Sequence, residues 1–319
     1  MARKKKNKAP LWWGVCLTFA LGAGALYLHF SNLVVVLMEG GLVSQMYQYI
    51  VGQHMKDLGY NVKYSLKFYD RGCRDTYNEF ARDFQLLKAF PYLEVPRANW
   101  VERVVCCRFF FYKNKTEHED KAEDHFDYLK AKPPVYLGEY HYNVALGTVD
   151  TETWPIRYGA APYEQYFHFD ENTLSAASKE VLERIQNMPT PVGVHVRLGD
   201  YNGGRGKAPS ASLVEYFVKA ITFLRGKFPD AHFFFFSEEP DLVRRFILPR
   251  VPQEIPCTMV DINSSGDCFM DLFLLSACKH QVMWCGSWHG PAHALNQYPG
   301  KILITPGNLE KMLLQESSP

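Results

Sequence analysis

The stretch VGVHVRLGDY, residues 192–201, opens the most regular part of the sequence. Its first half favours a β-strand, and a loop with several glycines follows it. The imidazole of His195, the guanidinium of Arg197 and the carboxylate of Asp200 stand at the end of this predicted strand. Polar groups in such a place belong either to a structural turn or to a ligand site, and the surrounding sequence indicates which fold carries them.

Strand and helix patterns alternate from this stretch to the C-terminus. A helical pattern over 212–227 has apolar residues on one face, while Glu215 and Lys219 lie four residues apart on the other. Helical patterns also separate the later apolar runs, which are HFFFFS, CTMVDI, QVMWCG and KILITP. Five alternations of this kind predict a parallel β-sheet with helices on both faces.

The preceding residues form a second, less regular α/β region. The continuous apolar run at 34–38 is typical of a strand buried on both faces, and Gly40-Gly41 makes the turn after it. A helical pattern follows, and NVKYSLKF predicts another strand. We therefore expect an N-terminal α/β half at 32–190, which includes a helical connection, and a C-terminal half at 191–319.

The composition is that of an ordinary globular protein. Of the 319 residues, 47% are hydrophobic and 22% are charged, and the net charge is +1. This balance gives no indication of nucleic acid as a partner. The aromatic content of 15% suits a carbohydrate-handling protein and equally suits a well-packed core.

The first thirty residues differ from the rest of the chain. MARKKKNKAP carries five cations and no acidic residue, and residues 11–30 carry no formal charge. In a helix, twenty residues at about 1.5 Å each just cross a hydrocarbon core of roughly 30 Å. We therefore predict a basic cytoplasmic tail at 1–10 and an uncleaved transmembrane anchor at 11–30, which leaves the remaining chain on the other side of the membrane. A secretory signal peptide is the alternative.

The cysteines indicate no metal site. Seven of the eight lie beyond the predicted anchor, so at least one cannot pair within the chain. Their spacing does not match a zinc site. His289 and His293 are four residues apart, but Gly-Pro lies between them and no carboxylate accompanies them. We therefore predict neither a metal ion nor another cofactor.

The residues around the opening stretch suit a phosphorylated ligand. The planar guanidinium of Arg197 matches phosphate oxygens, and Gly199 allows a close approach of the backbone. Asp200 can orient Arg197 or hold a hydroxyl group. An Arg–Asp ion pair in a turn explains the same residues without a ligand. Gly40 and Gly41 are similarly ambiguous, because they either expose helix N-terminal amides to an anion or form a simple tight turn.

Five segments in the same order resemble those of the α-1,2-fucosyltransferases, glycosyltransferase family 11. GGLVSQMYQY resembles their GGLGNQMFQY segment, VGVHVRLGDY resembles HxRRGDY, and DLFLLSACKH resembles their D-x-LLM-x-x-CKH helix. GEYHYN and HFFFFSEEPDLVRRF resemble a GYFQ-type stretch and a strand with an acidic SDD-type end. The resemblance covers about 33–305. It implies a GT-B-like fold of two facing Rossmann-type domains, GDP-fucose as donor, no metal in catalysis and inversion at the sugar carbon.

The resemblance also implies roles for individual residues. Arg197 would contact the β-phosphate of GDP, where charge develops as the fucosyl bond breaks. The implied donor-binding residues are His195, Arg197, Gly199, Gly40, Gly41, Gln45, Glu238, Glu239 and Ser287, and Asp271 and His280 match the family's helix. An inverting reaction needs a base for the acceptor hydroxyl. Glu39 and Asp200 are the two candidates.

The sequence departs from the family pattern at three places. Ser44 replaces an Asn, and Leu198 replaces the second Arg of HxRRGD, which is expected to remove one positive charge near the diphosphate. Of the family's NSSFSWW segment, the chain keeps only Ser287-Trp288 within 285–291.

These observations predict an enzyme that transfers L-fucose from GDP-fucose to a glycan hydroxyl. The expected product is an α-1,2-linked galactoside, and the expected partners are a GDP-sugar, a glycan acceptor and a membrane. The predicted protein is single-pass and type II, in the Golgi of a eukaryote or the inner membrane of a bacterium. A non-catalytic nucleotide- or glycan-binding relative on the same scaffold is the alternative.

Overall fold

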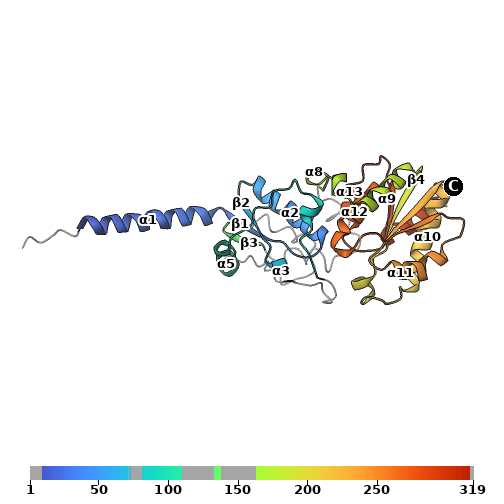
Figure 1. The fold of residues 1–319 in the computed structure, drawn as a ribbon, viewed down its shortest axis with the longest axis horizontal. Helices are drawn as coiled ribbons and strands as arrows, with labels where there is room; N and C mark the ends of the chain where they lie inside the picture. The colour runs from blue at the N-terminus through green and yellow to red at the C-terminus, as the bar shows by residue number, and fades with distance from the viewer. Residues whose placement is uncertain (1–8, 71, 73–80, 110–132, 138–162, 317–319) are drawn as a thin grey trace, which may run out of the picture. The chain divides into compact units, whose positions relative to one another are not determined.

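The computed structural model describes the chain in five stretches and divides it into two compact units. The described residues are 9–70, 72, 81–109, 133–137 and 163–316. The first unit comprises residues 1–37, 51–65 and 95–141, and the second comprises residues 38–50, 66–94 and 142–319. Each unit contains one β-sheet, and all the strand pairs are parallel (Figure 1). The protein therefore has an α/β fold, as the sequence predicts.

The sheet of the first unit has three strands in the order β2-β1-β3. These are β1 (Leu33–Leu37), β2 (Asn61–Ser65) and β3 (Val135–Leu137). Leu33 to Val36 have no solvent exposure, because β1 lies between two neighbours. The buried strand predicted from the apolar run and the strand predicted from NVKYSLKF are both confirmed.

A shared carboxylate joins two helices and a strand within the first unit. Glu102 lies on α5 (Trp100–Phe109) and accepts hydrogen bonds from His29, on α1 (Ala9–Ser31), at 2.8 Å and from Lys63, on β2, at 2.5 Å. Burial alone raises the pKa of Glu102, but the bond from Lys63 and its other neighbours lower it below the usual range. The carboxylate is therefore charged and holds the end of α1 against this unit.

Helix α1 covers the predicted anchor at 11–30 and so confirms its helical conformation. Within the stretches that the structure describes, however, no helix meets the length and hydropathy needed to cross a membrane. The tail at 1–8 lies outside the described residues. Membrane insertion of 11–30 therefore stays a prediction.

The sheet of the second unit has five parallel strands in the order β6-β5-β4-β7-β8. They are β4 (Thr190–His195), β5 (Ala231–Phe236), β6 (Cys257–Val260), β7 (His280–Met283) and β8 (Leu303–Ile304). These are the five strands that the alternating pattern predicts. Because β4 is central, its carboxyl end lies between those of β5 and β7.

Helices connect and flank these strands. They are α2 (Leu42–Asp57, whose first part belongs to this unit), α3 (Lys67–Asp70), α4 (Leu86–Ala89), α8 (Tyr163–Tyr166), α9 (Ala176–Asn187), α10 (Ala211–Lys227), α11 (Pro240–Leu242), α12 (Cys268–Ala277), α13 (His289–Ala294) and α14 (Pro306–Glu316). Ser210 accepts a hydrogen bond from the Leu213 amide and so caps α10. The helix predicted over 212–227 is confirmed within one residue.

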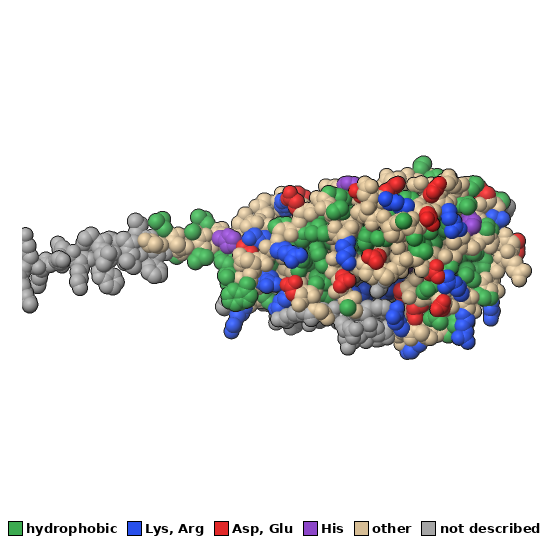
Figure 2. Space-filling model, viewed as in Figure 1, with side chains coloured by type: hydrophobic (Ala, Val, Ile, Leu, Met, Phe, Trp, Pro, Cys, Tyr) green, Lys and Arg blue, Asp and Glu red, His purple; other side chains and the backbone are tan. Residues whose placement is uncertain are grey.

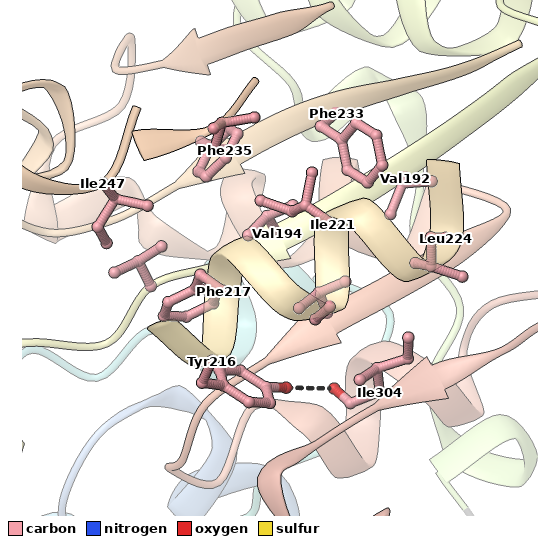
Figure 3. Packing of buried hydrophobic residues seen from close by; sticks show 14 of the residues in the cluster. Val192, Val194, Tyr216, Phe217, Ile221, Leu224, Phe233, Phe235, Ile247 and Ile304 are labelled. Atoms are coloured by element: carbon pink, nitrogen blue, oxygen red, sulfur yellow. Dashed lines mark hydrogen bonds between the residues drawn. The ribbon is translucent and has the colours of Figure 1, made fainter. Parts of the chain in front are cut away.

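The core of the second unit lies between α10 and the sheet (Figure 3). Phe217, Ile221 and Leu224 project from α10 toward the strands and are fully buried. Each side chain of this size contributes roughly 1.5–3 kcal/mol when it is fully buried. The Tyr216 hydroxyl donates to the carbonyl of Met283 at 2.7 Å and lies 3.0 Å from that of Ile304, which joins α10 to β7 and β8.

The two units are not the predicted halves 32–190 and 191–319. Residues 38–50 and 66–94 belong to the second unit although they precede residue 190. Ring contacts explain part of this, because Phe90 packs on Phe169 and Phe169 stacks on Phe273 of α12 at a centroid distance of 4.6 Å. Contacts between aromatic rings distant in sequence have no signature in local periodicity.

The surface of the second unit carries both signs of charge. On the face shown in Figure 2, basic and acidic side chains alternate over this unit without forming a large field of one sign. This distribution agrees with the net charge of +1 and gives no indication of a polyanionic partner.

Candidate functional site

The candidate site lies where β4 and β5 end side by side. His195 is opposite Phe236 in the ladder, and the Val196 amide donates to the Phe236 carbonyl at 2.9 Å. One residue further on, the Ser237 hydroxyl donates to the Val196 carbonyl at 2.8 Å. The two loops therefore begin together at the carboxyl edge of a parallel sheet, which is where such sheets bind ligands.

Two glutamates after β5 hold the loop that follows β4. Glu238 accepts the Leu198 amide at 2.9 Å, and Glu239 accepts the amides of Gly199 at 2.9 Å and Gly206 at 2.5 Å. Gly199 has a φ of 39°, a conformation that side chains disfavour. The amide of Gly199, where the sequence analysis expected the backbone to approach a phosphate, is thus bound to a carboxylate. Glu238 and Glu239 shape the loop from within the protein.

Arg197 projects its guanidinium beside the same carboxylates. Its Nη1 lies 3.4 Å from Oε1 of Glu238, and its side chain is 23% exposed. Arginine stays protonated at any physiological pH, and it can present several N–H donors to a planar anion. The ion pair therefore orients a permanent cation that solvent can reach.

Leu198 faces away from these charges. Its side chain has no exposure and packs in the core of the second unit. The expectation that this residue takes a charge away from the site does not fit the structure, because the position points into the core. A cation there would be buried among apolar side chains at a large cost.

His195 lies beneath an aromatic cover. It is 5% exposed, and its ring stacks on Trp288 with centroids 4.8 Å apart and planes 7° apart. Burial lowers the pKa of His195 to about 3, and the charges of Arg197 and His289 contribute. Its Nδ1 is buried and makes no hydrogen bond within the described part of the chain. A neutral imidazole with one unused polar atom is therefore available to a ligand or a water molecule.

The turn before α13 supplies Trp288. Gly286 has a φ of 98°, and its carbonyl lies 2.6 Å from Nδ1 of His289. Ser287 is half-buried in the same turn. The Ser-Trp remnant of the 285–291 segment thus covers His195, a role for Trp288 that the sequence analysis did not assign.

The turn after β1, which contains Gly40 and Gly41, belongs to the second unit and leaves little room for a side chain. Gly40 has a φ of 75°, and a Cβ there would lie 3.0 Å from the Ser44 side chain. Its carbonyl accepts the Tyr69 hydroxyl at 3.0 Å. A Cβ on Gly41 would lie 3.4 Å from Nη1 of Arg82. The turn therefore has an arginine beside it, which the sequence analysis missed because Arg82 stands in a stretch without clear periodicity.

Gln45 fastens this turn to a distant segment. Its side-chain oxygen accepts the amides of Gln85 and Leu86, both at 2.9 Å. Its side-chain nitrogen donates to the carbonyls of Gly40 at 3.2 Å and Asp83 at 2.9 Å. Gln45 is fully buried and its amide makes all four of these bonds. The prediction that Gln45 binds a donor does not fit the structure, because its hydrogen-bonding groups hold the protein's own backbone.

The two candidate bases occupy different places in the second unit. Glu39 is buried beside the glycine turn, and its amide donates to Oε1 of Gln48 at 2.8 Å. Burial and the negative charge of Glu39 both raise the pKa of Tyr69, so Glu39 lies close to that phenol. The backbone of Asp200 lies in the short helix Gly199–Asn202, and its side chain is outside the described structure. Both assignments as base stay predictions.

The start of α12 brings a thiol and a carboxyl group toward the same region. Cys268 donates to the Gln85 side chain at 3.0 Å, and burial raises the pKa of its thiol to about 12. The charges of Arg82 and Arg197 act against this rise. Burial raises the pKa of Asp271 to about 7, although Asn263 donates to it at 2.7 Å. Both cations are thus near enough to Cys268 to influence its titration.

His280 has a structural role. Its Nδ1 accepts the Ile302 amide at 3.1 Å, and its ring stacks on Phe228 at a centroid distance of 4.4 Å. Burial lowers the pKa of this histidine to about 4. His280, which matches the end of the family's helix motif, therefore joins β7 to Ile302 and Phe228.

Within the part of the chain that the structure describes, histidine, cysteine and acidic side chains form no cluster of three that could hold a metal ion. The free thiols of the described residues include Cys106, Cys107, Cys257, Cys268 and Cys278. The prediction of at least one unpaired cysteine is confirmed.

Residues 166–312 match the family model of glycosyl transferase family 11. The matched residues include the ends of β4 and β5, the Trp288 turn and α12. The resemblance recognised from the five segments is thereby confirmed for the second unit's sheet. The glycine turn and the Arg82 segment precede the matched residues.

Three solved structures are similar to most of the chain at low identity. POFUT1 in complex with GDP has 10% identity and a TM-score of 0.45, and the match covers 86% of this chain and 99% of that one. NodZ fucosyltransferase from Bradyrhizobium has 12% identity and a TM-score of 0.45, covering 85% and 95%. A mutant of Arabidopsis thaliana FUT1 in complex with GDP has 12% identity and a TM-score of 0.46, covering 87% and 71%. Among curated protein sequences, none matches this chain.

Proposed function

We propose that the protein transfers L-fucose from GDP-fucose to a glycan hydroxyl, specifically O-2 of a galactoside. The family 11 match supports glycosyl transfer, and the resemblance of the five ordered segments supports the donor and the linkage. The observation that carries the proposal is the ion-paired Arg197 at the carboxyl end of β4, beside neutral His195 under Trp288. A GT-B-like arrangement of two Rossmann-type domains belongs to this proposal.

Arg197 would act on the leaving group. As the acceptor oxygen bonds to the sugar carbon, the bond from that carbon to the β-phosphate oxygen breaks, and its electron pair stays on the phosphate. A fixed cation beside that oxygen stabilises the transition state more than the intact donor. Glu238 keeps the guanidinium in place before the charge develops. The acceptor proton passes to a base, for which Glu39 and Asp200 remain the proposed residues.

His195 would bind the donor without adding charge. Because burial lowers its pKa to about 3, the imidazole is neutral at pH 7. Its buried Nδ1 can then make one hydrogen bond to a polar atom of the nucleotide sugar. Trp288 excludes water from the other face of the ring.

We also propose that the reaction needs no metal ion. An arginine on the β-phosphate can replace the divalent cation that other transferases use to neutralise a diphosphate. Transfer measured after removal of metals with EDTA should therefore equal transfer in added Mg²⁺ or Mn²⁺. A restoration of activity by metal after EDTA treatment would contradict this part of the proposal.

The proposed location is a membrane, with residues 1–10 in the cytoplasm and 11–30 as a type II anchor. The uncharged run at 11–30 and the five cations before it support this orientation. The compartment would be the Golgi in a eukaryote and the inner membrane in a bacterium. In sealed vesicles, protease added outside should cleave only the tail when the catalytic part is luminal. Cleavage of the catalytic part would reverse the orientation.

An assay of the full-length protein in detergent tests the activity. Labelled GDP-fucose and a β-galactoside acceptor should give a fucosylated disaccharide with an α-1,2 linkage and release GDP. A folded protein that neither transfers fucose nor hydrolyses the donor would exclude the enzyme. Transfer to a different hydroxyl would keep the reaction and change the linkage.

A non-catalytic nucleotide-binding protein is the second candidate. The observation that favours it is the occupation of the Leu198, Gly199 and Gly206 amides by carboxylates, since these donors are then unavailable to a phosphate. Tight GDP binding in calorimetry without turnover in the same preparation would support this function over transfer.

A further inference from the structure

Helix α5 in the first unit presents an apolar face to solvent. Trp100 is 68% exposed, Val101 48% and Val104 40%, and their spacing places all three on one side of the helix. The opposite side, with Glu102 and Cys106, is buried. Because α5 thus reverses the usual arrangement of a surface helix, its exposed side indicates a contact surface.

Helix α5 lies beside the end of α1 (Figure 1). Glu102 is hydrogen-bonded to His29 at 2.8 Å, and Phe30 packs against the buried cluster that contains Cys106. His29 and Phe30 are the last two residues of the proposed anchor at 11–30. The contacts therefore hold α5 at the end of the segment that is proposed to enter the membrane.

The length of the anchor sets the level of α5. Twenty helical residues at about 1.5 Å each span a hydrocarbon core of roughly 30 Å, so His29 would lie at the boundary of that core. The headgroup layer beyond this boundary is about 5–8 Å thick. Trp100 precedes Glu102 by two residues, or about 3 Å along the helix axis. The first turn of α5 would therefore lie close to the lipid headgroups.

The side chains of this face match the chemistry of a lipid surface. Tryptophan is enriched at the boundary between membrane and water, because its ring is apolar while its N–H can reach a polar group. Arg97 and Arg108 are exposed near the two ends of α5, and Arg108 follows Val104 by one helical turn. Basic side chains in such positions attract anionic headgroups while their stems lie along apolar surface. The combination is typical of a helix that lies in a membrane surface.

We infer that the α5 face, defined by Trp100, Val101 and Val104, docks on the surface of the membrane, with Arg97 and Arg108 on anionic lipid headgroups. This inference rests on the proposed location, because the anchor brings α5 to the bilayer. Charge favours a lipid over a second copy of the chain. In a symmetric antiparallel pair, Arg97 of one copy would meet Arg108 of the other, and like charges oppose that pairing.

Quenching of tryptophan fluorescence by brominated lipids tests the contact. The full-length protein is reconstituted into vesicles of phosphatidylcholine and phosphatidylserine, with and without bromine on the acyl carbons nearest the headgroup. Trp100→Phe keeps the face apolar and removes the reporter, so it should lower the intensity that bromine removes. Trp284→Phe is the matched control, because Trp284 packs against the core of the second unit and contacts Tyr216. This variant should leave the quenched intensity unchanged.

Two further variants test the apolar and the charged part of the contact separately. Val101→Ser combined with Val104→Ser keeps Trp100 as reporter and should lower its quenching. Arg108→Gln should weaken docking about fivefold in vesicles with phosphatidylserine and change it little in phosphatidylcholine alone. Leu314→Ser is the control, because Leu314 is an exposed apolar residue on α14 of the second unit.

The outcomes separate the α5 contact from the proposed anchor. Quenching that Trp100→Phe leaves intact, but that Trp12→Phe with Trp13→Phe abolishes, overturns the contact and keeps the anchor. Quenching that depends on Trp100 alone supports the contact and rejects insertion of the anchor. Absence of quenching in the unsubstituted protein overturns both. Fucosyl transfer measured in detergent is independent of all these results, because no bilayer is present.

Sedimentation of the full-length protein in detergent tests the other occupant. A monomer is expected. A dimer that Val101→Ser with Val104→Ser dissociates, together with an unquenched Trp100 in vesicles, would assign the α5 face to a second copy and overturn the inference.

Discussion

Two glycine-containing turns of the second unit are held by different side chains, one neutral and the other charged. The turn at 39–41 is held by a neutral amide, that of Gln45. The loop that follows β4 is held by two carboxylates, those of Glu238 and Glu239. A neutral cross-link leaves nearby cations uncompensated, whereas an acidic one partly neutralises them. Arg82 forms no ion pair with the other described residues, while Arg197 pairs with Glu238.

The two kinds of cross-link both hold the backbone but have different effects on the local electrostatic potential. Carboxylates fix the β4 loop strongly but lower the positive potential that a phosphate would meet there. The amide of Gln45 fixes its turn without that electrostatic cost.

The largest expected effect comes from removing the oriented cation. Arg197→Ala should lower the rate of fucosyl transfer about 10²–10³-fold, because a preorganised group that stabilises transition-state charge is lost. Thermal unfolding should change little, since the side chain lies partly in solvent. Glu215→Gln, on the exposed face of α10, is the matched control and should keep full activity. Equal transfer rates in Arg197→Ala and Glu215→Gln would show that Arg197 does not stabilise the transition state.

The neutral cross-link can be broken at Gln45. Gln45→Leu leaves two carbonyls and two amides without their partner, so we expect a loss of about 3 kcal/mol in the free energy of unfolding. Urea denaturation followed by fluorescence measures this change. Gln53→Leu provides a control on the same helix, because Gln53 makes a single bond of 3.3 Å to the Tyr64 hydroxyl. Similar losses in both variants would show that Gln45 is not a special cross-link.

The pH dependence of stability tests the neutral imidazole of the β4 loop. His195 has a pKa of about 3 in the folded protein and an ordinary value near 6.5 when unfolded. Unfolded chains therefore bind a proton between these values that the folded protein does not, so folded stability falls as pH falls below about 6.5. The slope from this group is about 1.4 kcal/mol per pH unit.

His195→Phe should remove that contribution and keep the stacking on Trp288. We expect the difference in unfolding free energy between the variant and the unsubstituted protein to grow in favour of the variant from pH 6 to pH 4. Equilibrium denaturation at each pH provides the measurement. A constant difference over this range would mean that His195 is protonated in the folded protein.

The smallest expected effect concerns the acidic cross-link. Glu239→Gln keeps one side-chain oxygen, so one of the two amides of Gly199 and Gly206 loses its acceptor. We expect a loss of about 1 kcal/mol in stability and faster hydrogen exchange at one of these amides. Hydrogen-exchange mass spectrometry of the loop would detect it. Exchange as slow as in the unsubstituted protein would show that the loop holds its shape without the carboxylate.

Some predicted site residues kept their place and others changed their role. His195, Arg197 and Gly199 were placed correctly at the carboxyl end of β4, because strand ends follow from the local apolar pattern. Gln45 was assigned to a ligand, but its hydrogen bonds reach residues about forty positions away. A motif in sequence shows which residue is present and does not show the direction of its side chain.

The sequence by itself determined the α/β class, the five parallel strands of the second unit and the glycine turn after β1. These follow from the period of apolar residues and from glycine's conformational freedom, which act between near neighbours. Only the tertiary structure decided that Leu198 faces the core, that Trp288 covers His195 and that Arg82 lies beside Gly41. Each of these depends on packing between segments that are far apart in the chain, and local sequence patterns carry no record of such contacts.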